Sequence, residues 1–362
     1  MRSPQPRCLI AASLLVAALS LTGCSRDGPT QASQAAAATA SAVNEERVRI
    51  TNGDVMLAGT LLLPEGRQPR PAVVLFHGSG PQERDLRTAR WFAEHGVAAL
   101  AYDKRGVGES TGDFRKGPFM DLCDDGLAAI AYLKSRKEVD IKRIGVWGLS
   151  QGGWLGPMAA SRSGDVTWVI AVSGPGVSPG EQMIVYYANE LRRQDVPERD
   201  VEEASALRRE VYEYLYAGKG YEKVKADLDA ARRKRWYAPV NAQQDRLFEP
   251  LQRPGDLTDE RSPRAVRFAR EMHYDPVPAL EALRVPALFL FGDKDWLIPV
   301  EESVKVIQRV KAGGNHDFTI QVFQNVDHGM FVTAGDEAGS KSREYGAAMQ
   351  AWLAAHVLNK TQ

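Results

Sequence analysis

Short apolar runs alternate with stretches of helical periodicity along most of this chain, and this alternation limits its possible folds more than any other feature. The runs include PAVVLFHGSG, VAALAYDKRG, RIGVWGLSQGG, VTWVIAVSGPG and VPALFLFGDKD, and helical stretches such as RTARWFAEHG lie between them. Continuous apolar runs of strand length that alternate with helices are typical of parallel strands covered by helices on both faces. The sequence therefore predicts an α/β fold with a mostly parallel sheet.

Two regions depart from this alternation. Before the first of these runs, VRITNGDVMLAGTLLLP carries two strand-like segments around an Asn-Gly pair at 52–53, which predicts an antiparallel hairpin. Residues 181–275 are rich in Glu, Arg, Lys and Tyr and contain helical stretches such as EEASALRREVYEYLY without a strong strand. We therefore predict an eight-stranded core at residues 43–180 and 276–362, with a helical cap at 181–275 inserted between the sixth and seventh strands.

The N-terminus has the pattern of a targeting segment. Arg2 and Arg7 precede or flank the start of the apolar run LIAASLLVAALSL, which is too short to span a membrane and has the length of a signal-peptide core. The run ends in LTGC, which resembles the lipobox of bacterial lipoprotein signal peptides. That resemblance implies that residues 1–23 are removed and that Cys24 is lipidated. The alternative is an ordinary secretory signal with a chance cysteine.

Lipidation of Cys24 would anchor the chain to a membrane, because each buried CH₂ of an acyl chain contributes about 0.8 kcal/mol. By analogy with known lipoproteins, Ser25 after the cysteine favours the outer membrane over the inner one. Residues 24–42 are small and polar without an apolar period, which predicts a flexible tether. We therefore expect an exported, membrane-anchored lipoprotein that faces the periplasm.

Composition and missing motifs argue against several other classes. The 46 basic and 46 acidic side chains balance, whereas a duplex-binding protein normally has a basic excess, so we expect no nucleic-acid partner. Three cysteines, of which only Cys123 falls in the globular part, do not make a disulfide framework. GVGEST lacks the Lys-Ser/Thr ending of a phosphate-binding loop, RGVGES lacks the third glycine of a dinucleotide fingerprint, and no HExxH or Cys/His cluster suggests a metal. The sequence therefore predicts no cofactor and no metal site.

The stretch GVWGLSQGGWLG at residues 145–156 places Ser150 between Gly148 and Gly152. It follows a predicted strand and opens a predicted helix, which is the context of a nucleophile elbow. The two glycines leave room for a crowded turn, and the N-terminus of a helix favours negative charge that develops at the hydroxyl. We predict that Ser150 is a nucleophile rather than a small residue in an ordinary turn.

A serine hydroxyl is a poor nucleophile without a base. Of the six histidines, His77 and His328 alone follow strong predicted strands, and His328 comes after the last of them. We predict that His328 is the base and expect His77 to brace its loop.

A third residue must orient the imidazole and stabilise its cation. The stretch GDKDWLIP after the seventh strand offers Asp293 and Asp295, and Asp327 is next to His328. We predict Asp295, because it lies farther past the strand and reaches the next loop. Asp293 is expected to cap the turn, and Asp327 is the weaker rival because adjacent side chains seldom face one another.

The tetrahedral intermediate of acyl transfer needs two hydrogen-bond donors for its oxyanion. The backbone amide of Gln151, directly after Ser150, is the first candidate. The loop after the third strand reads His77-Gly78-Ser79-Gly80, where small residues let the main chain approach a substrate. The backbone amide of Ser79 is therefore the second candidate.

The motifs FHGSG, YDKRGVGES, GLSQGG, GDKDWLIP and VDHG together resemble the α/β-hydrolase superfamily, and more narrowly bacterial esterases and serine-aminopeptidase-like hydrolases that carry an HGSGP loop. The resemblance covers about residues 45–357, with the insertion least covered. It implies an α/β-hydrolase fold, a Ser-Asp-His triad, a helical cap, an acyl-enzyme route and no cofactor. The turn with Asp103 and Arg105 resembles the turn after strand four of these proteins, where both side chains are expected to brace loops.

These observations favour a serine hydrolase that cleaves carboxylic esters. One alternative is a peptidase for short peptides, whose cap would recognise a substrate amine with carboxylates. The other is a lipoprotein that keeps the fold and binds a ligand or partner without turnover. Relative rates on p-nitrophenyl esters and aminoacyl anilides distinguish the peptidase from the ester hydrolase. Failure to react with a fluorophosphonate would identify the non-catalytic lipoprotein.

Overall fold

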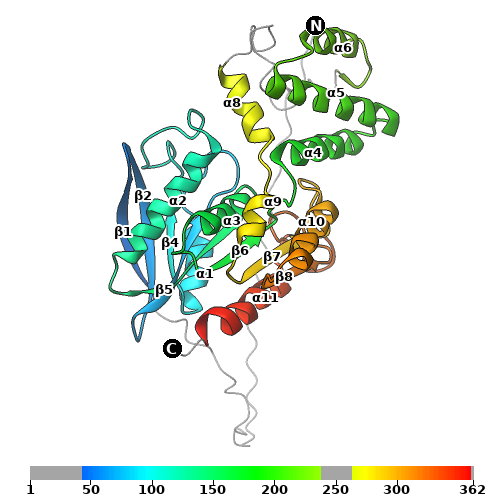
Figure 1. Ribbon diagram of the computed structural model, residues 1–362. Coiled ribbons are helices and arrows are strands. Elements are labelled where there is room, and N and C mark those ends of the chain that lie inside the picture. Colours follow the sequence, from blue (N-terminus) through cyan, green and yellow to red (C-terminus); the bar gives the residue numbers. More distant parts are fainter. Residues whose placement is uncertain (1–42, 238–262, 360–362) are drawn as a thin grey trace, which may run out of the picture. The chain divides into compact units, whose positions relative to one another are not determined.

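The computed structural model describes residues 43–237 and 263–359, so the predicted signal peptide (1–23), Cys24 and the tether lie outside the described residues. Eight strands form one sheet in the order β1-β2-β4-β3-β5-β6-β7-β8 (Figure 1). The strands are β1 (Val43–Asn52), β2 (Val55–Pro64), β3 (Arg70–Phe76), β4 (Ala98–Tyr102), β5 (Val139–Leu149), β6 (Trp168–Val172), β7 (Ala287–Gly292) and β8 (Phe318–Phe323). β3 to β8 are parallel, and β2 pairs antiparallel with β1 and β4. The predicted, mostly parallel eight-stranded sheet is confirmed.

The hairpin of β1 and β2 forms where the sequence predicts it, but its turn lies one residue later than the Asn-Gly pair. Asn52 pairs with Val55, so the turn residues are Gly53 and Asp54. Gly53 has a φ of 57°, which glycine adopts without steric cost. The positive φ at the first turn position therefore explains why Gly53 occupies it and why the strands pair in this register.

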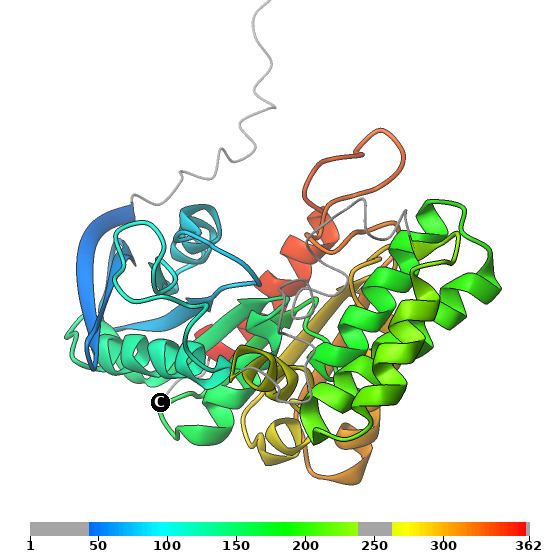
Figure 2. The same ribbon diagram turned by 90° about the horizontal axis from the view of Figure 1, so that it is seen from above.

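Helices cover both faces of the sheet, as Figure 2 shows for α2 and α10 on one side and α1 and α11 on the other. The first layer contains α2 (Phe119–Lys134), α3 (Gly152–Arg162), α9 (Val277–Ala282) and α10 (Val300–Gly313), and the second contains α1 (Leu86–Glu94) and α11 (Arg343–Leu353), which continues as a π-helix (Ala354–Leu358). Along β3, Val74 and Phe76 enter the first core while Val73 and Leu75 enter the second. Successive residues of a strand point to opposite faces, so burial of both faces explains the continuous apolar runs.

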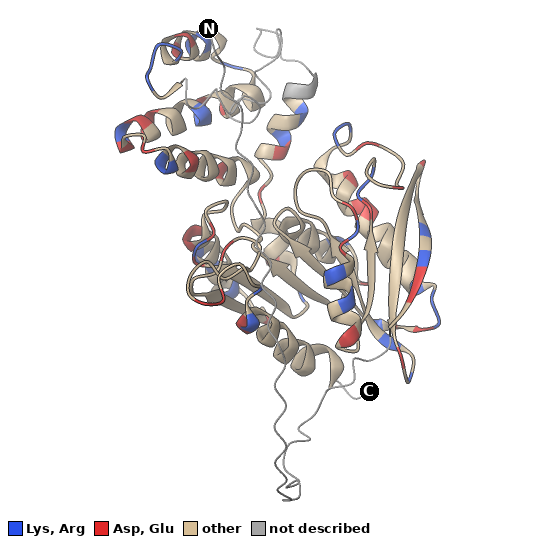
Figure 3. Ribbon diagram, turned by 180° about the vertical axis from the view of Figure 1, so that it is seen from behind, with Lys and Arg blue, Asp and Glu red and all other residues tan. Residues whose placement is uncertain are grey.

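The described part of the segment between β6 and α9 consists of helices joined by short loops. Its helices are α4 (Pro179–Arg193), α5 (Glu198–Ala217), α6 (Tyr221–Ala231) and α8 (Pro263–Met272). They share a separate hydrophobic core, whose buried members include Leu191, Val211 and Trp236. Charged residues of both signs are mixed over these helices (Figure 3). Within the described ranges, no helix has the length and apolar character needed to cross a membrane.

Candidate active site

The site residues predicted from the globular part follow the carboxyl ends of four parallel strands. Ser79 follows β3, Ser150 and Gln151 follow β5, Asp295 follows β7, and His328 follows β8. Parallel strands bring their carboxyl ends to one edge of the sheet, where ligands of open α/β folds bind. The sheet therefore carries these residues on one edge, and the contacts between the loops decide which of them meet.

Ser150 occupies a strained turn between β5 and α3. Its φ is 55°, a left-handed conformation that residues other than glycine rarely adopt. Its amide donates a hydrogen bond of 2.9 Å to the carbonyl of Val172, at the end of β6. This bond holds the elbow against the neighbouring strand and leaves the partly exposed Ser150 at the N-terminus of α3.

The backbone around Ser150 leaves no space for side chains at two glycines. A Cβ at Gly148 would lie 2.2 Å from the carbonyl oxygen of Gly152. A Cβ at Gly153 would lie 2.2 Å from the Cα of Gly174, in the loop after β6. Glycine is therefore needed at both positions, at the first for the tight elbow and at the second for the close approach of α3 to that loop.

His328 and Asp295 meet. Nδ1 of the imidazole lies 2.7 Å from Oδ2 of Asp295, whose side chain is fully buried while that of His328 is 16% exposed. A carboxylate only accepts hydrogen bonds, so Nδ1 carries the proton and Nε2 of the neutral ring is left free to accept one. Oδ1 of Asp295 accepts a second bond of 2.9 Å from the amide of Leu297, which fixes the carboxylate in its loop.

Ser173, which the sequence analysis did not identify, joins the loops after β6 and β8. Its hydroxyl donates a 2.9 Å hydrogen bond to the carbonyl of His328, and its φ is 47°. Ser173 directly follows Val172, which accepts the Ser150 amide. The backbones of Ser150 and His328 are thus both tied to the end of β6. Among the described residues, no hydrogen bond joins the Ser150 hydroxyl to the His328 ring, and such bonds are often long in enzymes without substrate.

The rival carboxylates have structural partners of their own. Asp293 accepts a hydrogen bond of 3.3 Å from the amide of Val326, which links the loop after β7 to the loop after β8. Asp327 accepts bonds from the amides of Gly329 and Phe331 at 2.9 and 2.8 Å. Asp293 therefore closes a turn, and Asp327 shapes the loop in which His328 sits.

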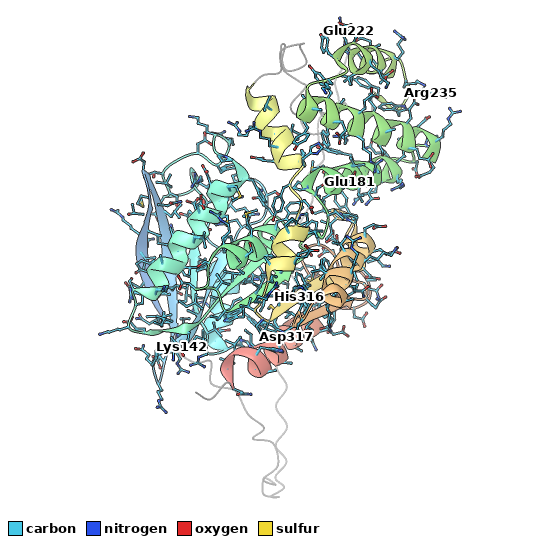
Figure 4. All side chains as sticks on the ribbon, in the orientation of Figure 1. Lys142, Glu181, Glu222, Arg235, His316 and Asp317 are labelled. Atoms are coloured by element: carbon cyan, nitrogen blue, oxygen red, sulfur yellow. The ribbon has the colours of Figure 1, made fainter. Side chains whose placement is uncertain are left out.

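Two other histidines illustrate the structural role that most loop histidines have. Partly buried His77 donates from Nε2 to the carbonyl of Tyr102 at 2.6 Å, and desolvation, together with the charge of Lys104, lowers the pKa of His77 to about 4. His316, labelled in Figure 4, precedes β8 and bonds the carbonyl of Leu283 at 3.0 Å. His316 thus lies at the opposite end of the strand from His328.

A buried lysine connects the two loops that carry the predicted oxyanion donors. The Lys104 ammonium donates to the carbonyl oxygens of Gly78 and Gly80 at 2.6 and 2.9 Å. It also donates to Oε1 of Gln151 at 3.1 Å. No sequence pattern marks Lys104 for this role, because its partners lie 24 to 47 residues away and only the folded chain brings them together.

Asp103 and Arg105, on either side of this lysine, hold neighbouring segments. Arg84 donates to both carboxylate oxygens of Asp103, at 2.9 and 2.6 Å. Burial opposes ionisation of Asp103, but the hydrogen bonds from Arg84 and from two backbone amides outweigh it and lower its pKa. Arg105 forms a bidentate pair with Asp125 and a further bond to Asp121, both on α2. These contacts brace the loop after β4.

A cavity of about 570 Å³ is lined by Gln151 and Lys104 and by residues of α8. Its walls combine aromatic side chains, among them Phe119 and Phe268, with charged ones. Glu271 of α8 is the notable acid there, because burial raises its pKa to about 7 although Arg267 and the amide of Phe119 oppose the shift. This carboxyl was not singled out from the sequence, where the cap has too many acids to choose among.

The cap is attached to the loop that carries Asp295. Nδ2 of Asn189 on α4 donates to the carbonyl of Trp296 at 2.9 Å. The Trp296 ring stacks on Tyr186, with ring centroids 5.4 Å apart, and lies beneath the Arg193 guanidinium at 4.5 Å. The residue next to the carboxylate is therefore held by three side chains of one cap helix.

The free cysteine and the arrangement of possible metal ligands bear on thiol and metal chemistry. Cys123 is a free, buried thiol, and burial raises its pKa to about 11, which keeps it protonated and unreactive. Within residues 43–237 and 263–359, no group of three or more His, Cys, Asp or Glu side chains is placed to hold a metal.

The sequence model of the family described as "Serine aminopeptidase, S33" matches residues 67–333 of this chain. Esterase EstD of Thermotoga maritima is 26% identical over 300 residues, which are 80% of this chain and 61% of that esterase. Quorum-quenching protein AidA of Acinetobacter baumannii is 34% identical over 111 residues, which are 29% of this chain and 36% of that protein. The chain thus spans less than two thirds of the length of these relatives.

Solved structures with the same architecture include an esterase of Pyrococcus furiosus, with a TM-score of 0.54, 17% identity and coverage of 87% of this chain and 92% of that one. The α/β-hydrolase GrgF from Penicillium gives a TM-score of 0.54 at 21% identity, covering 87% of this chain and 99% of GrgF. At these identities the likeness concerns the fold, and it confirms the α/β-hydrolase fold that the sequence predicts.

Proposed function

Because this chain belongs to the serine aminopeptidase S33 family and has the α/β-hydrolase fold, we propose that it is a serine hydrolase that cleaves carboxylic esters through an acyl-enzyme intermediate. The observation that carries the proposal is the hydrogen bond of 2.7 Å between Asp295 and His328. The Ser173 hydroxyl ties the His328 backbone to the end of β6, and the same strand end accepts the Ser150 amide. A strained serine at a helix N-terminus and an oriented imidazole are the parts that nucleophilic acyl transfer requires.

The first half of the reaction forms the acyl-enzyme. Nε2 of His328 takes the proton of the Ser150 hydroxyl while Oγ attacks the ester carbonyl carbon, and the carbonyl electrons move onto oxygen. The imidazolium, held by Asp295, then gives that proton to the alkoxy oxygen as the carbon–oxygen bond breaks. The alcohol leaves, and the acyl group stays on Ser150.

The second half repeats these steps with water. Nε2 of His328 takes a proton from a water molecule, whose oxygen attacks the acyl carbon. The second tetrahedral intermediate collapses, the proton returns to Oγ of Ser150, and the carboxylic acid leaves. The three side chains and water account for every proton that moves in these steps.

The backbone amides of Gln151 and Ser79 would bind the oxyanion of both intermediates. The amide of Gln151 opens α3, whose macrodipole favours negative charge. Preorganised donors of this kind contribute about 10²–10³ each to the rate, because they are already aimed where the charge develops. Ester substrates are proposed in part because proteins similar to this chain carry the name esterase.

The test is hydrolysis of p-nitrophenyl esters of graded acyl length, combined with labelling by a fluorophosphonate. We expect turnover by the wild type and a covalent adduct on Ser150. Ser150→Ala should abolish both, while Ser161→Ala, on the helix that follows and with a local side-chain bond to the carbonyl of Met158, should change neither. Turnover by Ser150→Ala at the wild-type rate would refute the proposal.

A peptidase for short peptides is the second candidate, and Glu271 is the observation that favours it. This carboxyl lines the cavity next to Gln151, so it could pair with the amine of a peptide substrate when ionised. Higher kcat/KM on aminoacyl p-nitroanilides than on p-nitrophenyl esters would establish this candidate. Turnover of the esters without measurable turnover of the anilides would establish the ester hydrolase.

We also propose that the chain is exported and anchored to a membrane through lipid on Cys24, with its globular part in the periplasm. The support is the LTGC sequence directly after the apolar run. Cells fed a labelled fatty acid should produce a labelled protein in the membrane fraction. Cys24→Ala should lose the label and leave that fraction, and retention of the label would refute the anchor at this residue.

A further inference from the structure

Lys104 is a cation buried without a carboxylate. It directly follows Asp103 after β4 and is 2% exposed. No carboxylate in the described ranges lies within ion-pair distance of its ammonium, and its three hydrogen bonds go to Gly78, Gly80 and Gln151. Burying an ammonium without a counter-ion is costly, so the position of this lysine calls for an explanation beyond packing.

The first contact determines where the Ser79 amide points. The peptide bond between Gly78 and Ser79 is trans and planar, so the carbonyl of Gly78 and the N–H of Ser79 point in opposite directions. Because Lys104 draws the Gly78 carbonyl to itself at 2.6 Å, the amide of Ser79 is directed away from the lysine. The bond to the Gly80 carbonyl, at 2.9 Å, holds the chain one residue beyond Ser79.

The second contact reaches the other predicted oxyanion donor. Oε1 of Gln151 accepts from the same ammonium at 3.1 Å, which restrains the residue whose backbone amide follows the nucleophile. The two loops come from β3 and β5, which are neighbours in the sheet. A single ammonium therefore cross-links the two halves of the site.

We propose that Lys104 is a positioning residue that aims the Ser79 amide and holds Gln151, so that both donors are in place before an oxyanion forms. This inference rests on the proposed serine-hydrolase function. The positive charge adds to the effect, because a fixed cation in a desolvated site stabilises negative charge that develops nearby. Burial lowers the pKa of Lys104 to about 8, so most of the ammonium stays charged at neutral pH.

The loop has other supports, which separate positioning from folding. The side-chain carbonyl of Gln82 accepts the Gly78 amide at 2.8 Å, and the Gln82 backbone carbonyl accepts the amide of Lys104 at 3.1 Å. These bonds do not involve the ammonium. A variant that lacks only the ammonium should therefore keep the loop in place while the orientation of its peptide planes relaxes.

The experiment compares Lys104→Met, which keeps the length of the side chain and removes its donors, with the wild type and with Lys134→Met as a surface-lysine control. We expect Lys104→Met to lower kcat on p-nitrophenyl esters by about 10²-fold, the effect of losing one oxyanion donor, with KM within about threefold. Affinity for a trifluoromethyl ketone, which forms a tetrahedral adduct with the serine, should fall by the same factor. Affinity for the corresponding methyl ketone should not change.

A structural role predicts a different result. If the loss of activity matched the fraction of unfolded chain, or if the two ketones lost affinity equally, the proposal would be overturned. Lys104→Gln, whose amide can still donate to one carbonyl, serves if Lys104→Met does not fold. The kcat of Lys104→Gln should lie between those of the wild type and Lys104→Met. A wild-type kcat in either folded variant would also overturn the proposal. A wild type that neither turns over esters nor reacts with fluorophosphonate would overturn the proposed function together with this inference.

Discussion

The strand ends of the core and the helical cap differ in how their side chains are held. At the strand ends, buried polar side chains are fixed by specific partners, such as Asp295 by His328 and Leu297. The cap has a hydrophobic core of its own and contacts the site through a small number of side chains on α4 and α8. Under the proposed function, the core supplies the chemistry and the cap selects what reaches it. Mutations should therefore affect kcat in the first region and KM in the second.

The largest effect should come from Asp295→Asn. An asparagine at this position can donate its amide N–H to Nδ1, which would leave the proton on Nε2 and remove the base from the reaction. We expect kcat to fall by about 10⁴-fold with little change in KM. The matched control is Asp293→Asn in the same loop, whose side-chain oxygen can still accept from Val326. If Asp295→Asn kept a tenth of the wild-type kcat, the assigned role of this carboxylate would be wrong.

Ser173→Ala should have the next largest effect. It removes the hydroxyl that holds the backbone of His328, so we expect kcat to fall about 10- to 10²-fold as the imidazole loses its alignment with Ser150. Ser303→Ala is the control, because Ser303 is also fully buried but its hydroxyl has no hydrogen-bond partner among the described residues. Equal activities of the two variants would show that the Ser173 bridge does not position the base.

Trp296→Ala tests the boundary between the two regions. Its ring contributes a stacking and a cation–π contact to the cap, together worth about 1 kcal/mol, so we expect KM to rise about fivefold. Hydrogen exchange of α4 amides should become faster. Lys294→Ala, an exposed change two residues earlier, should leave both quantities unchanged. A fall in kcat with an unchanged KM would instead place Trp296 with the chemistry of the core.

Glu271→Gln should have the smallest effect, and it should depend on pH. Above pH 7 the carboxyl ionises, and a partly exposed charge pair is worth about 0.2–1 kcal/mol. KM for an aminoacyl substrate should therefore drop by a factor of about 1.4 to 5 between pH 6 and 8 in the wild type. The variant should show no such change. KM for an uncharged ester should change little with pH in both proteins. A wild-type plot of KM for the aminoacyl substrate against pH without an inflection near pH 7 would contradict the assignment.

The same residue makes a prediction for stability. The pKa of Glu271 is about 7 in the folded chain, above its ordinary value of 4.5, so between these values the folded state holds a proton that the unfolded state releases. The stabilising contribution is present below pH 4.5 and is lost as the pH rises through 7. In chemical denaturation, the free energy of unfolding should therefore decline between these values by more in the wild type than in Glu271→Gln.

Much of the fold and of the candidate site follows from local patterns in the sequence. Apolar runs with both faces buried predict parallel strands, and glycines around Ser150 predict an elbow because only they fit the crowded backbone. The position of Asp295 beyond its strand predicts its reach to the next loop, and the structure places it against His328. These features are readable because they depend on strand burial, on backbone crowding within a few residues, or on the meeting of parallel strand ends at one edge of the sheet.

Other features were decided by the tertiary structure. The Ser173 hydroxyl and the carbonyl of His328 are 155 residues apart in the chain, and the Lys104 ammonium and Oε1 of Gln151 are 47 apart. Glu271 acquires its raised pKa only because folding buries it in the cavity. Local sequence sets backbone conformation and strand burial, whereas hydrogen-bond partners and desolvation depend on which distant loops the sheet order brings to one edge.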